Sequence, residues 1–333
     1  RAMPFFHSQA AGEELRHGFS TQPGDIFSTG YLSSGNLLCQ CAALTLLAGG
    51  DASAVDLNVD GGLKAGNLLF LELAISRGQI GAQPPPHHDI PLAPLLVPAD
   101  ARVASAAADP HKIDQLPPAS RVFKSHMPPR GLPCRLAADG VGLPAGLKIV
   151  HPVRDPRDVC VAAFEFLKLD GSGSGSGDVD MKWDQWVEGF ISGKAPWGGW
   201  LQQNKEWWDA SRQQPEQVLW TTFEDCVANP TQEVRRIADF LGLQLPPERL
   251  EATARAITIG EMEKRYTPEH PGLLKERRTT GEAREHFSAA QLEQFDEHVI
   301  QPALDCGMRL RLSSPSRAVA PSERAVGGSE RRV

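Results

Sequence analysis

The chain has 333 residues, of which 41% are hydrophobic and 23% are charged, with 31 glycines and 27 prolines. This composition predicts one large or two ordinary folded domains, and the frequent glycine and proline exclude a coiled coil or a plain helical bundle. The net charge of −7 argues against a general nucleic-acid or membrane-surface binder, so an anionic ligand has to meet a local cluster of positive charge.

Neither the first residues nor the cysteines are typical of an exported protein. No run of about 18 apolar residues is present, and Glu13, Glu14 and Arg16 stand where a signal peptide would have its apolar region. The six cysteines include no Cys-x-x-Cys pair, which favours buried free thiols. His87-His88-Asp89 lacks a third well-spaced ligand. We therefore expect a cytoplasmic protein that holds no metal, spans no membrane and binds no nucleic acid.

The pattern along the chain predicts a single folded domain over residues 23–312. Residues 1–22 form an extension before it, and residues 313–333 are polar, rich in serine and arginine and aperiodic, as in a disordered tail. Within the domain, residues 83–118 are rich in proline. Residues 170–178 contain the repeat GSGSGSG, which predicts a flexible loop, either natural or engineered.

Short apolar runs alternate with helical patterns along this domain. Buried strands are predicted at Asp25–Thr29, Arg121–Lys124, Lys148–Pro152 and Gln217–Thr222. Helices are predicted from Gly35 to Gly49-Gly50, over Leu201–Ser211, from Asn229-Pro230 to Gly242, and over Ala289–Leu304. This alternation predicts an α/β domain with a central, mostly parallel sheet flanked by helices.

The loop after the first strand has the composition of a phosphate-binding turn. Ligands of such sheets bind at the carboxyl ends of the strands, and a loop that opens a helix presents backbone N–H groups to a phosphate. Ser33, Ser34 and Asn36 offer side-chain donors, and Gly35 permits close approach of the backbone. The alternative is that these small polar residues simply cap the helix.

Basic residues follow the next two strands. Lys124 and His126 are two residues apart at a strand end and project in one direction. A cation beside an imidazole suits a base that removes a proton while negative charge is stabilised; the alternative is a histidine that caps the strand. After the third strand, Arg154 and Arg157 offer planar forks for a phosphate, unless they pair with the neighbouring aspartates.

These segments, in this order, resemble the cytosolic sulfotransferase family. The family pattern runs Y-P-K-S-G-T-T-W, K-T-H-L-P, R-N-P-K-D-V, E-W-W, Y-E-D, N-P to F-L-G, and R-K-G. This chain has YLSSGNLL, KSHMP, RDPRDV, EWW, FEDC, NPTQEVRRIADFLG and ERR. The resemblance covers residues 23 to 312, and an ordered series of matches is specific where any single match is not.

The resemblance implies a sulfotransferase fold with one P-loop-like domain. It also implies transfer of a sulfonate group from 3′-phosphoadenosine 5′-phosphosulfate (PAPS) to a hydroxyl or amine of a small-molecule acceptor. His126 would be the general base, and Lys124 would stabilise charge on the transferring group. The loop from Ser33 to Leu37 would bind the cofactor by cradling its 5′-phosphosulfate. Arg154 and either Arg277 or Arg278 would hold the 3′-phosphate. Phe223 would be a further cofactor-binding residue.

Several family positions carry other residues here. Ser33 stands in place of the loop lysine that contacts the bridging oxygen of the leaving group, and Leu38 in place of the tryptophan that stacks on adenine. The remaining replacements are Leu32 for proline, Ala162 for serine, Phe223 for tyrosine and Ala283 for tryptophan. Loss of a charge-stabilising donor commonly lowers a rate by about a hundredfold or more. A catalytically impaired nucleotide- or small-molecule-binding protein on the same fold is therefore the alternative function.

A second loop offers a different location for the lysine. Residues 64–69 repeat the Gly-Asn-Leu-Leu of the first loop, with Lys64 two residues before the glycine. We prefer the first loop, because the stretch from Pro23 to Tyr31 supplies the preceding strand. A kinase is disfavoured, because the chain has no GxxxxGK[ST] motif.

The sequence near the C-terminus matches the spacing of the family's dimerisation motif. Arg284, Ser288-Ala289 and Glu293 fit K-x-x-x-T-V-x-x-x-E with conservative replacements. This predicts a homodimer, with a charged helix start capped by Ser288 as the alternative.

Overall fold

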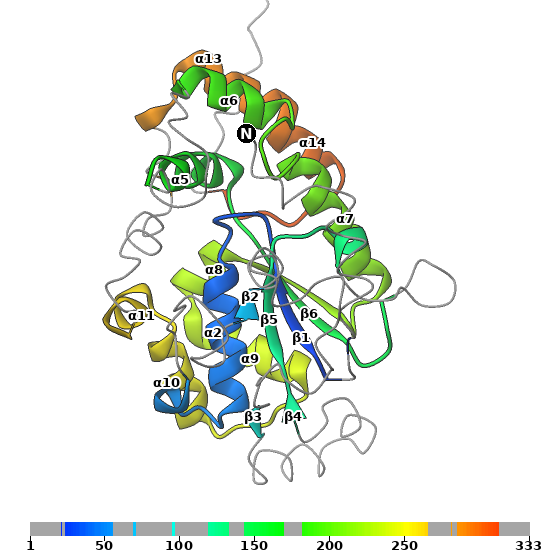
Figure 1. Cartoon of the computed structure of the whole chain (residues 1–333), viewed down its shortest axis with the longest axis vertical. Helices are drawn as coiled ribbons and strands as arrows, with labels where there is room; N and C mark the ends of the chain where they lie inside the picture. Colours follow the sequence, from blue (N-terminus) through cyan, green and yellow to red (C-terminus); the bar gives the residue numbers. More distant parts are fainter. Residues whose placement is uncertain are drawn as a thin grey trace, which may run out of the picture.

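The computed structural model describes residues 21, 24–55, 69–70, 95–96, 119–132, 143–169, 182–265, 281 and 285–312. Their centre is a parallel sheet of order β2-β5-β1-β6-β7 (Figure 1). Its strands are β1 (Ile26–Thr29), β2 (Leu69–Phe70), β5 (Val122–Ser125), β6 (Lys148–Val153) and β7 (Val218–Thr222). The short strands β3 (Leu95–Leu96) and β4 (Ala119–Ser120) form a separate antiparallel pair. The predicted α/β class and parallel sheet are confirmed.

The four predicted strands are present, and their ends differ from the predictions by one residue. β5 begins and ends one residue later than predicted, and β6 continues to Val153. Asp25 and Arg121 precede β1 and β5, and their side chains form a two-pronged ion pair, with Nε to Oδ1 at 2.8 Å and Nη2 to Oδ2 at 2.6 Å. This pair ties the two strands together at the end of the sheet where they begin.

One face of the sheet packs against α2 (Asn36–Leu47), whose sequence NLLCQCAALTLL contains no charged residue. All residues of α2 are buried, between the sheet on one side and α9 (Pro230–Leu241) and α10 (Pro247–Ala256) on the other. Two further helices, α8 (Phe223–Ala228) and α11 (Ile259–Arg265), and the 3₁₀ turn η1 (Ala52–Ala54) complete this layer. A helix that is apolar on every side fits only such a central position.

The predicted ends of α2 and α9 are confirmed. α2 stops before Gly49 and Gly50, whose φ angles of 68° and 83° favour glycine. A side chain on Gly50 would also lie 2.8 Å from the Arg249 carbonyl oxygen. α9 begins with Pro230 after Asn229 and ends at Gly242 in the left-handed conformation, although the Asn229 side chain makes no capping hydrogen bond.

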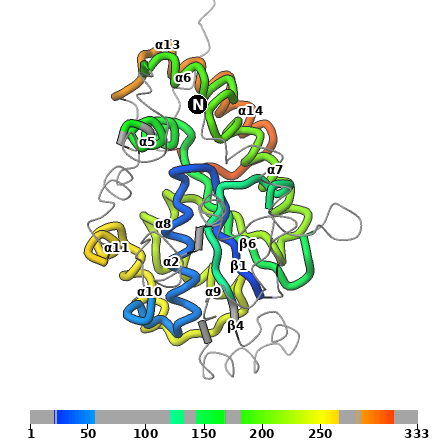
Figure 2. Tube along the Cα trace, in the orientation of Figure 1, coloured from blue at the N-terminus to red at the C-terminus, as the bar shows by residue number. Residues whose placement is uncertain are grey.

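The other face is covered by α5 (Pro156–Leu169), α6 (Trp183–Ile191) and α7 (Trp200–Gln213), which pack large aromatic side chains against Phe27, Phe123 and Ile149. The C-terminal helices α13 (Ala289–Phe295) and α14 (Gln301–Asp305) lie beside α6 and α7 (Figure 2). A π-helical turn, η6 (Asp296–Ile300), interrupts the single helix predicted here. The 3₁₀ turn η3 (Pro129–Gly131) follows β5.

Several predictions concern residues outside the described part of the chain. These are the extension 1–22 apart from residue 21, the Pro-rich stretch 83–118 apart from β3, the Gly/Ser loop 170–178, the tail 313–333, and Lys64, His87-His88-Asp89, Ala283 and Arg284. Five cysteines lie within the described part of the chain, and all five are free thiols. In the described ranges, no cluster of histidine, cysteine or acidic residues could hold a metal. The helices described there are too short or too polar to cross a bilayer.

Replacement of Ser288 tests the start of α13. The Ser288 hydroxyl accepts a hydrogen bond from the Gln291 N–H, and the Gln291 side chain accepts one from the Ser288 N–H. We expect Ser288→Ala to lower the free energy of unfolding by about 1 kcal/mol in urea denaturation. Ser288→Thr keeps the hydroxyl and should match the wild type; equal losses in both variants would contradict the capping role.

Candidate active site

The loop between β1 and α2 lies at the carboxyl edge of the sheet and has an unusual backbone. Ser33 has a φ of 63° and Gly35 a φ of 106°, and the strain of a non-glycine residue at positive φ is typical of functional turns. The hydroxyls of Ser33 and Ser34 are buried and have no hydrogen-bond partner among the described residues. Two buried donors beside the start of a helix suit an anion.

Arg154 lies against this loop. It follows β6, is 2% exposed, donates from Nη1 to the Ser33 carbonyl oxygen at 3.2 Å, and places its guanidinium 4.5 Å from the centre of the Phe223 ring. Burial lowers the pKa of Arg154, while Asp158, Glu224 and Asp155 act in the opposite direction. Phe223 in turn touches Gly35, since a Cβ there would lie 2.9 Å from the ring. The structure thus brings Ser33, Gly35, Arg154 and Phe223 together.

The other arginine after β6 has a structural partner. Arg157 forms a two-pronged ion pair with Asp155, at 3.0 and 2.7 Å, and both side chains are buried. The alternative of local pairing therefore holds for Arg157. Asp158, in the first turn of α5, accepts from the Gly281 N–H at 3.0 Å, which ties Gly281 to this corner.

Glu224 adds a carboxyl group to the same corner. Its Oε1 accepts from the Asp155 N–H at 2.9 Å, and its Oε2 is buried without a hydrogen-bond partner in the described part of the chain. Burial raises the pKa of Glu224 to about 7, although the Asp155 N–H and the nearby Arg154 lower it. The side chain is therefore partly protonated near neutral pH.

Lys124 and His126 lie at the end of the neighbouring strand β5. They are 8% and 6% exposed, and Lys124 pairs in register with Ser28 of β1. The Nδ1 of His126 is 2.8 Å from the Gly30 carbonyl oxygen and 2.9 Å from Nδ2 of Asn36. The base predicted after β5 is therefore joined directly to the loop predicted to bind phosphate.

The hydrogen-bond count favours one tautomer of His126. The Asn36 Nδ2 group has two hydrogens and lies 2.9 Å from the Gly30 oxygen and 3.0 Å from the Ser125 oxygen. Carbonyl oxygens only accept hydrogen bonds. If His126 Nδ1 carries a proton, three hydrogen bonds form: two from the Asn36 amide to the Gly30 and Ser125 oxygens, and one from Nδ1 to the Gly30 oxygen. Without that proton, the lone pair of Nδ1 would face the Gly30 oxygen. The Nδ1–H form leaves the Nε2 lone pair of His126 to accept a proton.

Helix α7 holds the turn that carries His126. Gln203 donates from Nε2 to the His126 carbonyl oxygen at 2.6 Å, and Trp207 donates from Nε1 to the Met127 oxygen at 3.1 Å. Both side chains are buried. Gln203 was not predicted from the sequence, although a polar residue on the buried side of a helix, four residues before a tryptophan, is a detectable signal.

The second buried histidine has a different environment. His151 of β6 contacts Thr29 Oγ1 at 3.3 Å and Asn204 Oδ1 at 3.0 Å, and its ring centre lies 5.4 Å from that of Trp207 and 5.0 Å from that of Trp220. Burial lowers its pKa to about 3, although the Asn204 contact acts against this. His151 is therefore neutral and serves packing.

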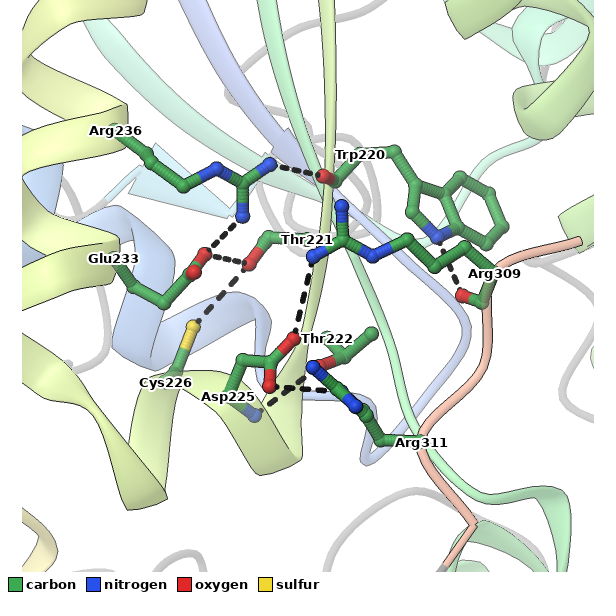
Figure 3. A network of polar contacts seen from close by, with 9 residues as sticks. All are labelled: Trp220, Thr221, Thr222, Asp225, Cys226, Glu233, Arg236, Arg309 and Arg311. Carbon is green, nitrogen blue, oxygen red and sulfur yellow. Dashed lines mark hydrogen bonds and ion pairs between the residues drawn. The ribbon is translucent and has the colours of Figure 1, made fainter.

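The end of β7 is held by a polar network that reaches the C-terminal segment (Figure 3). Asp225 pairs with Arg311 at 3.0 Å and with Arg309 at 3.6 Å, and the Trp220 indole donates to the Arg309 carbonyl oxygen at 2.9 Å. On the other side of the strand, Thr221 donates to Glu233 at 2.7 Å. These contacts fix the start of α8, which carries Phe223 and Glu224.

Most of the predicted site residues therefore share one edge of the sheet. Leu37, predicted to belong to the loop, is the second residue of α2, and its side chain is buried in the core cluster that also contains Phe223. Arg277 and Arg278 lie outside the described residues. Glu224 was missed, because its buried position depends on the contact with Asp155.

A family model decides where this chain belongs. The family model for the sulfotransferase domain matches residues 70–306 of this chain. The chain belongs to the sulfotransferase family. β1 and the loop after it precede the matched range, so the family match does not extend to them.

Curated sulfotransferases share the central part of the chain. Sulfotransferase 1A1 of Rattus norvegicus is 29% identical over 205 residues, which cover 58% of this chain and 66% of the relative. Sulfotransferase 1E1 of Mus musculus is 25% identical over 203 residues, covering 58% of this chain and 65% of the relative. The matched region thus spans slightly less than two thirds of these relatives.

Solved sulfotransferase structures share the fold. Mouse sulfotransferase SULT7A1 complexed with PAP superposes with a TM-score of 0.56 at 17% identity, covering 87% of this chain and 88% of that one. Retinol dehydratase in complex with androsterone and the inactive cofactor PAP gives a TM-score of 0.57 at 18% identity, covering 87% of this chain and 83% of that one. The predicted sulfotransferase fold is confirmed.

Glu224 predicts an unusual dependence of stability on pH. Because its folded pKa of about 7 lies above the ordinary 4.5, its contribution destabilises the fold increasingly as pH rises from about 4.5 to 7. Glu224→Gln keeps the oxygen that accepts from Asp155. We expect this variant to be more stable than the wild type by roughly 1 to 3 kcal/mol at pH 8 in urea denaturation, and by much less at pH 5.

Glu216→Gln is the matched control, because the Glu216 side chain is exposed. It should change stability little at either pH. A Glu224→Gln effect of the same size at pH 5 and pH 8 would contradict the shifted pKa.

Proposed function

We propose that this protein transfers a sulfonate group from PAPS to a hydroxyl, or an amine, of a small-molecule acceptor. The observation that carries the proposal is the contact between the two halves of the site, in which His126 Nδ1 lies 2.8 Å from the Gly30 oxygen of the loop that would hold the phosphosulfate. The names of the relatives, and PAP in the solved complexes, support the same activity.

The loop and the arginine corner would bind the nucleotide. Backbone N–H groups at the start of α2, where no acidic side chain occupies the first turn, and the hydroxyls of Ser33 and Ser34 would meet the 5′-phosphosulfate. Arg154, held by Ser33 and Phe223, would meet the 3′-phosphate, with Arg277 or Arg278 as a second cation. These groups fit a small polyanion, since two buried hydroxyl donors and a buried guanidinium lie together at the loop.

The base and the lysine would carry out the chemistry. PAPS supplies the sulfonate group and leaves as 3′,5′-bisphosphate when its sulfur–oxygen bond breaks. His126 Nε2 takes the proton of the acceptor hydroxyl, so that the acceptor oxygen forms the new bond to sulfur. Lys124 stabilises the negative charge that develops on the transferring group. The proton remains on His126 until the product leaves, and no metal is required.

The absent loop lysine defines what this chain does differently. With Ser33 at that position, the cations assigned to the described site are Lys124 and Arg154.

We also propose that the protein is a homodimer in the cytoplasm. A mass equal to that of one chain in light scattering would contradict the dimer. A pure binding protein is disfavoured, because binding alone gives no reason for a Nε2-basic histidine beside a buried lysine.

Arg154 gives the first functional test. We expect wild-type protein to bind 3′-phosphoadenosine 5′-phosphate in calorimetric titration, and Arg154→Ala to bind at least about tenfold more weakly, because a charge-assisted pair of hydrogen bonds is lost. Arg255→Ala is the matched control, since Arg255 is exposed on α10. Absence of binding to the wild type would overturn the proposed function.

His126 gives the second functional test. We expect His126→Ala to lower sulfonate transfer to a panel of phenols and alcohols by at least about a hundredfold, because the general base is removed. Titration with 3′-phosphoadenosine 5′-phosphate should show unchanged affinity. His298→Ala, at an exposed position on the C-terminal helices, should retain full activity, and full activity in His126→Ala would refute the assigned role.

A further inference from the structure

The side-chain amide of Asn36 touches both the phosphate loop and the base. Asn36 is the first residue of α2 and is 2% exposed. Its Nδ2 donates to the carbonyl oxygens of Gly30 and Ser125 and lies 2.9 Å from Nδ1 of His126. The side chain is thus directed to the turn after β5, while its main-chain N–H stays at the helix start where the phosphosulfate is proposed to bind.

The surroundings of Asn36 leave little freedom for this amide. A Cβ built on Gly30 would collide with Oδ1 of Asn36 and would lie 2.7 Å from the Pro152 carbonyl oxygen. The absence of a side chain at Gly30 therefore permits the amide to sit between β1 and β5. Both amide hydrogens are used by main-chain oxygens of these two strands, which fixes the orientation of the amide.

We propose that Asn36 is a positioning residue for His126, and that its amide fixes the Nδ1–H tautomer and the plane of the imidazole. The inference rests on the proposed function of His126 as the base. With the amide in place, the Gly30 oxygen is held where it accepts from Nδ1–H, and Nε2 keeps the lone pair. The family pattern has threonine here, whose single hydroxyl hydrogen cannot satisfy both carbonyl oxygens.

Asn36 acts on the base and not on the nucleotide, so its removal should separate the two properties. We expect Asn36→Ala to lower kcat by about tenfold or more, because a misoriented base transfers protons poorly. The KM for PAPS and the affinity for 3′-phosphoadenosine 5′-phosphate should stay unchanged. Asn36→Thr should behave like Asn36→Ala.

Nitrogen-15 NMR of histidine-labelled, unliganded protein measures the tautomer directly, with the His126 signal assigned from a His126→Gln sample. We expect the Nδ1–H form in the wild type and a mixture of tautomers in Asn36→Ala. Gly30→Ala retains the amide but displaces it, and should give the same mixture. Gln40→Leu is the matched control, because it removes another buried amide of α2 and should leave the His126 tautomer unchanged.

The outcomes separate this inference from the proposed function. Wild-type protein that binds no nucleotide would refute the function, while the tautomer in unliganded protein would still decide the role of Asn36. An unchanged tautomer in both Asn36→Ala and Gly30→Ala would overturn the inference. Loss of nucleotide affinity with unchanged kcat in Asn36→Ala would also overturn it, because Asn36 would then be a ligand of the nucleotide.

Discussion

The position of β1 between β5 and β6 is the constraint on which the site depends. The register pairs Ile26 with both Val122 and Lys148, so the ends of the three strands reach the same edge of the sheet. The residue after β1 is Gly30, which therefore lies beside His126 at the end of β5 and beside Pro152 of β6. A shift of one residue in this register would turn every side chain of the shifted strand to the opposite face and would separate His126 from the loop.

The same edge concentrates charge in a protein that is acidic overall. Arg154 is buried, and its nearest carboxylates belong to Asp155, Asp158 and Glu224. Asp155 accepts a hydrogen bond from Arg157, and Asp158 accepts one from the Gly281 N–H. Glu224 is partly protonated near neutral pH, because burial raises its pKa to about 7. The carboxylates near Arg154 thus have other hydrogen-bonding partners or are partly neutral, which reduces the negative charge around the guanidinium.

Sequence patterns predicted what is local. The four strands are each marked by a short apolar run, and the ends of α2 and α9 by glycine, so their positions follow from backbone chemistry. The family motifs placed Lys124, His126 and Arg154 at strand ends. The π-helical turn in the C-terminal helix was not predicted, because residues 289–304 keep one helical pattern through it.

The contacts that tune the site are tertiary, and the sequence does not reveal them. Gln203 reaches His126 across 77 residues, and Asn36 reaches it across 90. Such pairs depend on how α2 and α7 pack on opposite faces of the sheet. A motif can mark His126, but the hydrogen-bonding partners of its ring come from the end of β1 and from α2.

The substitution at Ser33 illustrates how these levels combine. A lysine in the loop would place a mobile cation near the leaving group, whereas Ser33 contributes a hydroxyl and a backbone held at positive φ. Its carbonyl oxygen accepts a hydrogen bond from Arg154, so this bond holds the arginine side chain against the loop. Negative charge on the nucleotide would then be met by fixed dipoles, by Arg154 and by Lys124. In the proposed reaction, Lys124 would then provide most of the transition-state stabilisation, while Arg154, held beside the loop and Phe223, would bind the nucleotide.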